Sequence, residues 1–93
     1  MQLPDIVIKV VSQEGHCEMG HKVGDEFVIK KGKMTQDLCV YAFSSIFPMA
    51  SALLWGGSFP YEDDPIRTKA ACPDPDNPCH FELRRVGKPP EKD

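Results

Sequence analysis

Residues 38–55 read LCVYAFSSIFPMASALLW, the most apolar stretch of the chain and the one that decides its fold. Its apolar side chains recur at helical spacing and fall on one stripe of a predicted α-helix: Leu38, Ala42, Ser45 or Ile46, Met49 and Leu53. Thr35 or Asp37 is expected to cap the start of this helix, and Gly56-Gly57 ends it. Pro48 is expected to kink the helix or divide it in two, because proline removes a backbone donor and clashes with the preceding turn.

Segments rich in β-branched and alternating residues flank the helix on both sides. They are predicted strands, at residues 5–11 and 25–31 before the helix and 66–72 and 80–86 after it. This order lacks the βαβ alternation of a parallel sheet. We therefore predict an α+β domain with a small, mostly antiparallel sheet (β-β-α-β-β) around one central, Pro-kinked helical segment. Residues 1–86 form a single domain in this prediction, and residues 87–93 a flexible charged tail.

Length, charge and motif content exclude several classes of protein. The 93 residues suffice for one small domain with a thin core. A formal net charge of −3 without a basic block argues against nucleic-acid binding. No run approaches the roughly 18 apolar residues that a membrane span needs. The sequence has no G-x-S-x-G, P-loop or G-x-G-x-x-G pattern and no evident Cys–His–acid set, so an enzyme is the less favoured class.

The four cysteines are the main chemical feature of the chain. Their meaning depends on the compartment. The N-terminal residues MQLPDIVIKVV have no basic region and alternate apolar residues with charges, so they are no signal peptide, and we expect a cytoplasmic protein. Because cytoplasmic thiols are kept reduced, an even number of cysteines indicates metal or redox chemistry more than disulfides.

The cysteines lie mostly in loops or at the ends of predicted elements, where side chains can converge. Cys39 falls in the first turn of the predicted helix, whose dipole favours a thiolate. Cys72 and Cys79 flank a proline-rich loop, and His21 follows Cys17 by four residues across a glycine, so both can face one site. A Cys3His site for zinc or iron is chemically sensible. The absence of a C-x-x-C pair excludes the usual zinc-knuckle and ferredoxin patterns, and small buried hydrophobes remain the alternative interpretation.

Two other groups of residues are candidates for interactions. Trp55, Phe59 and Tyr61 follow the helix closely and either bind a partner or cover the thin core. With so little core, burial of this aromatic loop against copies of the chain would form a homo-oligomer. Arg84 and Arg85 form one basic point that can pair with the acidic residues of the same loop.

The chain resembles a family of small cysteine-containing proteins met mainly in anaerobic bacteria and archaea. The resemblance spans about residues 8–86 and is carried by seven motifs: Gly15-His16-Cys17, GHKVGDEF from Gly20, Leu38-Cys39, Pro48, GGSFP from Gly56, CPDP from Cys72 and FELRR from Phe81. The family pattern centres on three cysteines that match Cys17, Cys39 and Cys72. This chain departs from it at Asp37-Leu38-Cys39-Val40, where the family often has Gly-Leu-Cys-Pro, and at Cys79, where the family often has an apolar residue.

The resemblance brings no firm function with it, but it implies a ligand set. A protein of anaerobes with three or four spaced cysteines is expected to bind an iron–sulfur cluster, with [4Fe–4S] favoured, and to serve a redox partner in electron transfer or as an accessory. Cys17, Cys39 and Cys72 are then the ligands, and the fourth is Cys79 or His21. The alternatives are a structural zinc site made by the same residues and a metal-free interaction module that uses the aromatic loop.

Overall fold

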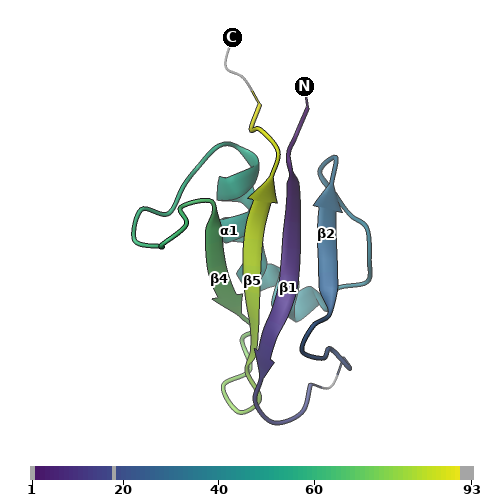
Figure 1. Cartoon of the computed structure of the whole chain (residues 1–93). Coiled ribbons are helices and arrows are strands. Elements are labelled where there is room, and N and C mark those ends of the chain that lie inside the picture. The colour runs from purple at the N-terminus through teal and green to yellow at the C-terminus, as the bar shows by residue number, and fades with distance from the viewer. Residues whose placement is uncertain (1, 18, 91–93) are drawn as a thin grey trace.

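The computed structural model describes residues 2–17 and 19–90 of the chain. Within them the chain forms one α-helix and a five-stranded antiparallel sheet, which confirms the predicted α+β class (Figure 1). The elements are β1 (Asp5–Gln13), β2 (Glu26–Lys30), β3 (Lys33–Met34), α1 (Val40–Leu54), β4 (Arg67–Ala71) and β5 (Cys79–Val86). The strand order is β3-β2-β1-β5-β4, so the first strand of the chain is the central one.

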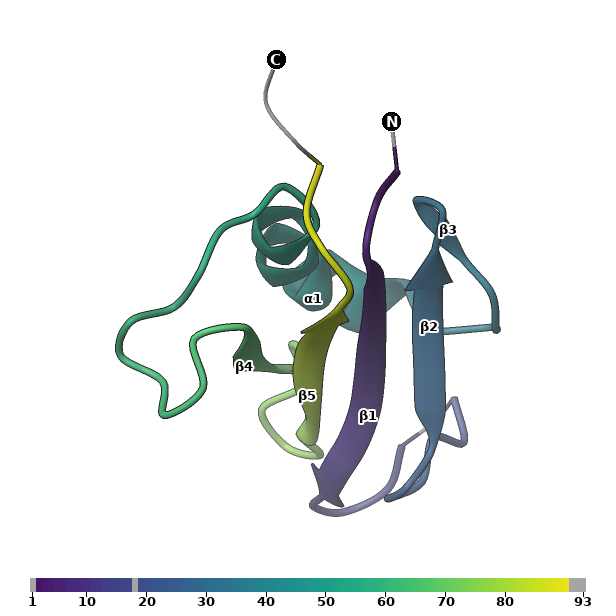
Figure 2. The ribbon, with the colours of Figure 1, turned by 45° about the horizontal axis from the view of Figure 1, so that its top comes forward.

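Helix α1 covers one face of the sheet, and the core lies between the two layers (Figures 1 and 2). Strand β1 places Ile6, Ile8 and Val10 in this core, while the residues between them turn to the other face, as the two-residue period of a strand requires. The helix contributes residues at three- and four-residue spacing, which confirms most of the predicted stripe: Ala42, Ile46, Ala50, Leu53 and Leu54 are buried.

The opposite face of the sheet is polar. Glu26, Lys9, Glu82 and Lys69 are successive cross-strand partners on β2, β1, β5 and β4, so they form a row of alternating charge. Opposite charges on neighbouring strands attract each other, and an antiparallel sheet tolerates one face in water. This face therefore needs no second layer of helices.

The start of the helix differs from the prediction. Cys39 is the residue before the first turn and its carbonyl accepts the Phe43 N–H at 2.9 Å, but among the described residues its own side chain makes no capping hydrogen bond. The expected caps Thr35 and Asp37 are therefore wrong; the Thr35 hydroxyl donates to the Val28 carbonyl instead. Pro48 does not divide the helix, because it lies within the continuous segment Val40–Leu54 on an exposed side.

Strand β3 was not predicted, because residues 31–33 suggested only a turn. Lys31 and Gly32 both have positive φ, at 53° and 74°, and Lys30 pairs with Lys33 across them. Two successive positive φ values match the right-handed twist of the flanking strands, so the turn continues into a hairpin. The dipeptide lacks the usual Asn-Gly signal.

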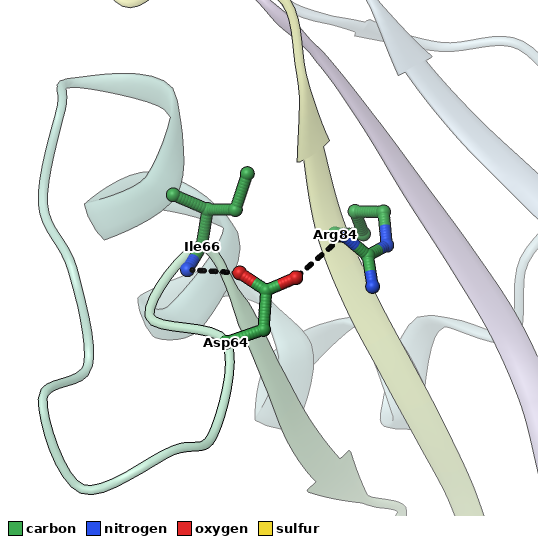
Figure 3. A network of polar contacts seen from close by, with 3 residues as sticks. All are labelled: Asp64, Ile66 and Arg84. Atoms are coloured by element: carbon green, nitrogen blue, oxygen red, sulfur yellow. Dashed lines mark hydrogen bonds and ion pairs between the residues drawn. The ribbon is translucent and has the colours of Figure 1, made fainter.

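The two neighbouring arginines of β5 have different roles. Arg84 pairs with Asp64 at 2.7 Å, and the same carboxylate accepts the Ile66 N–H at 3.3 Å (Figure 3). These two hydrogen bonds, the one from Arg84 first, lower the pKa of Asp64. Arg85 instead donates to the carbonyl oxygens of Leu53 and Gly57 at 3.1 and 3.0 Å. The predicted pairing with the acidic loop thus holds for Arg84 alone.

Replacing Arg85 by alanine is expected to destabilise the protein more than replacing Arg84 by alanine. Arg85 satisfies two carbonyls at the end of α1, where a positive charge also complements the helix dipole, and we expect a loss of about 1–3 kcal/mol. The Arg84–Asp64 pair lies at the surface, where solvent screens ion pairs, so its loss should have little effect on stability. Urea unfolding of both variants checks this difference, and equal midpoints would contradict the capping role of Arg85.

The chain beyond β5 returns toward the end of the helix. A Cβ at Gly56 would approach the Cβ of Pro89 to 3.2 Å, so Pro89 lies close to this glycine. The rest of the predicted charged tail, residues 91–93, lies outside the described residues. Among the described helices, none has the length and apolar character that crossing a membrane requires.

Candidate functional site

Two long connections meet at one end of the sheet. The β1–β2 connection, residues 14–25, and the β4–β5 connection, residues 72–78, both lie at the end away from the two termini (Figure 1). They are brought together because β1 and β5 are adjacent and antiparallel, so the end of β1 meets the start of β5. The start of α1 completes this region, because residues of all three segments line one pocket.

The pocket has a volume of about 330 Å³, at the small end of the range for ligand sites. All five residues that the sequence marked as candidate ligands line it: Cys17, Cys39, Cys72, Cys79 and His21. Its remaining wall is largely apolar and consists of Met19, Tyr41, Ala42, Pro73, Asp74, Asn77 and Phe81. The fold therefore collects thiols from four separate places in the sequence around one hollow.

Each cysteine reaches the pocket from a different local structure. Cys17 lies in the β1–β2 connection, Cys39 immediately precedes α1, Cys72 follows β4 and Cys79 opens β5. Cys79 is 1% exposed, whereas the other three are half-buried. Every second residue of β5, from Cys79 to Phe81 and Leu83, is buried on the helix side of the sheet. The strand that contributes Phe81 and Leu83 to the core therefore also directs the Cys79 thiol inward.

His21 links the first cysteine loop to the start of the helix. Its Nε2 accepts the backbone N–H of Cys39 at 3.1 Å, and its ring packs edge-on against Phe27 with centroids 5.0 Å apart. An Nε2 that accepts a hydrogen bond carries no proton, so the proton of the neutral ring is on Nδ1. Binding a metal through Nε2 would break this bond to Cys39.

Asn77 links the two cysteine loops through hydrogen bonds to residues far away in the sequence. Its Oδ1 accepts the His16 N–H at 3.0 Å, and its carbonyl accepts from Gln13 Nε2 at 3.1 Å. Asp74 in turn holds Asn77, accepting its backbone N–H at 3.2 Å. Asp and Asn are residue types that suit turns by bonding their own backbone, so the sequence carries no signal for this contact with a distant loop.

Gly15 lies against the Asn77 side chain that accepts the His16 N–H. It has φ +70°, and a Cβ there would come within 2.1 Å of Asn77 Oδ1. Gly20 has a similar φ of +81°, but no atom of the described residues lies within 4 Å of such a Cβ. A substitution at either glycine meets the strain of a positive φ, but only a substitution at Gly15 also displaces Asn77. Comparing the two positions therefore isolates the effect of displacing Asn77.

Gly15→Ala is expected to destabilise the chain more than Gly20→Ala. Both variants carry the roughly 1–2 kcal/mol cost of a left-handed alanine. Only Gly15→Ala also displaces Asn77 and loses its hydrogen bond to His16, adding about 0.5–1.5 kcal/mol. Denaturant midpoints of the two variants measure the difference, and it should vanish when both are made in an Asn77→Ala background. A persistent difference there would show that Asn77 is not its cause.

The buried thiol differs electrostatically from an ordinary cysteine. Burial, and then the nearby Cys17 and Cys72 side chains when ionised, raise the pKa of Cys79 from 9.0 to about 11. The charged form is disfavoured because the low-dielectric interior solvates it poorly. Cys79 is thus a neutral thiol in the metal-free protein at neutral pH.

In the metal-free folded protein, Cys79 is expected to be the slowest thiol to react with iodoacetamide. A rise of two pKa units lowers the thiolate fraction about a hundredfold, since the thiolate is the nucleophile. Folding raises the pKa of Cys79, so the protonated thiol favours the folded state. This contribution to the free energy of unfolding is fully present below pH 9 and is lost as the pH rises toward 11. Peptide mapping after brief alkylation checks the order, with the urea-unfolded chain as control; equal labelling of all four thiols in the folded protein would contradict it.

The thiols share a pocket without converging on one point. Across residues 2–17 and 19–90, no group of three or more His, Cys, Asp or Glu side chains is arranged to hold a metal ion. The five candidate ligands thus line the same pocket, and which of them bind a metal stays a prediction.

The aromatic loop lies away from the thiol pocket. Phe59 packs against the core and contacts the ring of Tyr61 edge-on at 5.9 Å, while Trp55 and Tyr61 remain largely exposed. Acidic residues of the same loop bind the sheet, with Glu62 accepting from the buried Thr68 hydroxyl at 3.1 Å. One of the three aromatic residues thus covers the core, and a partner-binding role of the other two stays a prediction.

The fold and the site together define a small two-layer α+β domain with a thiol-lined pocket at the end of its sheet. Comparisons with protein-family models, with curated proteins and with solved structures find no significant match for this chain. The resemblance to the cysteine-containing proteins of anaerobes therefore stays a prediction.

Proposed function

We propose that this protein binds an iron–sulfur cluster, with [4Fe–4S] favoured, in the pocket at the end of its sheet and serves electron transfer or a redox accessory role. The observation that carries the proposal is that all four cysteines, from four separate segments, line one pocket of about 330 Å³. Thiolates are the usual ligands of such clusters.

The spread of the thiols favours a cluster over a single zinc ion. A structural zinc needs its sulfurs within about 2.3 Å of one centre, whereas no three of the described His, Cys, Asp or Glu side chains are arranged around a single ion. In a [4Fe–4S] cluster each thiolate binds a different iron, so the sulfurs remain apart and the cluster fills the volume between them. Zinc bound by the same residues would require the segments to close inward.

The backbone around the pocket suits a negatively charged group. Helix α1 begins at Val40 without a side-chain cap, and its first-turn residues Tyr41 and Ala42 line the pocket. Free N–H groups and the positive end of the helix dipole favour an anionic occupant. The Cys79 N–H also donates to Cys72 Sγ at 3.2 Å, a type of bond that tunes cluster potentials.

Cys79 is better placed than His21 as the fourth ligand. Cys79 lines the pocket, and its Sγ makes no hydrogen bond with the described residues. His21 Nε2, in contrast, already accepts the Cys39 N–H. In this proposal His21 positions Cys39, as outer residues orient the ligands of metal sites. The three-plus-one division implied by the family resemblance then becomes four cysteines in this chain.

Purification without oxygen, followed by iron, sulfide and zinc analysis and a visible spectrum, tests the proposal. A brown protein with stoichiometric iron and sulfide that bleaches on chelation is the expected result. A colourless protein with stoichiometric zinc would favour the structural zinc site. A chain with neither metal, four alkylatable thiols and unchanged stability after reconstitution with iron and sulfide would overturn the proposal.

A further inference from the structure

Cys72 and Cys79 form a closely matched pair within the pocket. Strands β4 and β5 are in register up to Ala71 and His80, so Cys72 and Cys79 are the next pair toward the connecting loop. The Cys72 N–H donates to the Cys79 carbonyl at 2.9 Å, and the Cys79 N–H donates to Cys72 Sγ at 3.2 Å. Cysteines opposite each other in such a ladder have Cα atoms about 5.5 Å apart, inside the range of about 4.4–6.8 Å that a disulfide spans.

Both side chains also lie on the same side of the sheet. Thr68 and Phe81 are buried beneath the helix, and the two-residue period carries this orientation from Thr68 to Cys72 and from Phe81 to Cys79. Cys17 and Cys39 belong to other segments and share no ladder with either residue. We propose that Cys72 and Cys79 are a reversible dithiol–disulfide pair, which oxidises when the pocket holds no metal.

The oxidation is a two-step exchange with a small disulfide such as glutathione disulfide as the oxidant. The Cys72 thiolate attacks one sulfur of that disulfide, a mixed disulfide forms and one glutathione thiolate leaves. The Cys79 thiol then loses its proton to solvent and displaces the second glutathione, forming the Cys72–Cys79 bond. Two protein thiols are oxidised, one small disulfide is reduced to two thiols, and a small dithiol reductant reverses the sequence.

The half-buried and the buried cysteine suit these two steps. Cys72 is the more accessible of the pair and meets the oxidant first, while Cys79 is 1% exposed and has Cys72 as its cross-strand neighbour. The Cα spacing of about 5.5 Å in a hydrogen-bonded pair is among the commonest for disulfides, so the bond can form without moving the strands apart. Because Cys72 is only half-buried, its sulfur stays accessible to thiol reductants, and such accessible disulfides are typically labile or regulatory.

The pair has a consequence for metal loading, which rests on the proposed function. A disulfide between Cys72 and Cys79 removes two of the four thiols that line the pocket. The oxidised chain then cannot accept a cluster until a thiol reductant reopens the bond. The pair itself does not depend on the cluster, because its evidence is the geometry of β4 and β5.

Treating the folded, metal-free, reduced chain with glutathione disulfide tests the inference. The expected result is the loss of two of the four alkylatable thiols, with peptide mapping that joins Cys72 to Cys79 and leaves Cys17 and Cys39 alkylated. Dithiothreitol should restore all four. Four free thiols, a stable glutathione adduct or a predominant pair that includes Cys17 or Cys39 would overturn the inference, whatever the metal analysis shows.

Variants separate the pair from unfolding and misfolding. A Cys17→Ser, Cys39→Ser double variant retains only the proposed pair and should still oxidise, while Cys79→Ser should stop at a glutathione adduct on Cys72. Circular dichroism before oxidation checks that each variant is folded. If a variant is unfolded, the wild-type peptide map alone decides the outcome. Iron uptake by the oxidised wild type, with and without dithiothreitol, then tests the loading consequence separately.

Discussion

Cys72→Ser is expected to leave the anaerobically prepared protein without stoichiometric iron and without visible colour. Changes outside the ligand set typically cost metal sites about 10–100-fold in affinity, and loss of a direct thiolate ligand costs more. Cys72 is half-buried, so the isosteric hydroxyl should leave the metal-free fold intact. Because a metal that binds only the folded state stabilises it, the variant should also lose the rise in melting temperature that loading gives.

Ala71→Ser is the matched control for this experiment. It adds the same hydroxyl one residue earlier, on the side of β4 that alternation turns away from the helix. It should bind iron as the wild type does. A Cys72→Ser protein that retains full iron, colour and melting temperature would contradict the role of Cys72 as a ligand, and equal loss in both variants would indicate a general effect on the strand.

Leu83→Ala is expected to lower the free energy of unfolding of the metal-free protein by about 2–5 kcal/mol, the range for large-to-small changes in a core. Leu83 is 0% exposed and lies between Ile8 of β1 and Thr68 of β4 in the sheet. Domains are stable by only about 5–15 kcal/mol, and small ones fall at the low end. The variant should therefore unfold at a much lower urea concentration or be largely unfolded without urea.

Val86→Ala provides the comparison on the same strand. Val86 is 48% exposed, so its truncation removes little buried surface and should change the free energy of unfolding by less than about 0.5 kcal/mol. Urea melts followed by circular dichroism measure both. Similar losses for Leu83→Ala and Val86→Ala would contradict the two-layer arrangement in which only one face of β5 is covered.

Most of the fold was predictable from local patterns. The apolar run of residues 38–55 and the alternating segments around it have periods that differ between helix and strand, so element type and order could be predicted. The α+β class follows from that order, because one helix between strand pairs covers one face of an antiparallel sheet. The errors were at element ends: β3 depends on positive φ at Lys31, and the helix starts at Val40 after an uncapped Cys39.

The candidate site was predictable only as a set of residue types. Cysteine and histidine in loops indicated metal or redox chemistry, because these side chains have that chemistry wherever they lie. Which of them meet is decided by the sheet order. Placing β5 beside β1 brings the Cys79 end of one strand to the loop of Cys17, and covering that face with α1 brings Cys39 to the same pocket.

The roles of Asn77 and His21 depend entirely on this long-range packing. Asn77 has a turn composition, and His21 sits in a glycine-rich loop, so neither carries a local signal for binding the His16 or Cys39 amide. Periodicity and composition describe neighbours along the chain, and they determined the class of fold and the kinds of chemistry available. The tertiary structure alone decided the ligand neighbourhood, because hydrogen bonds between residues 18 and 61 positions apart form only after the strands have paired.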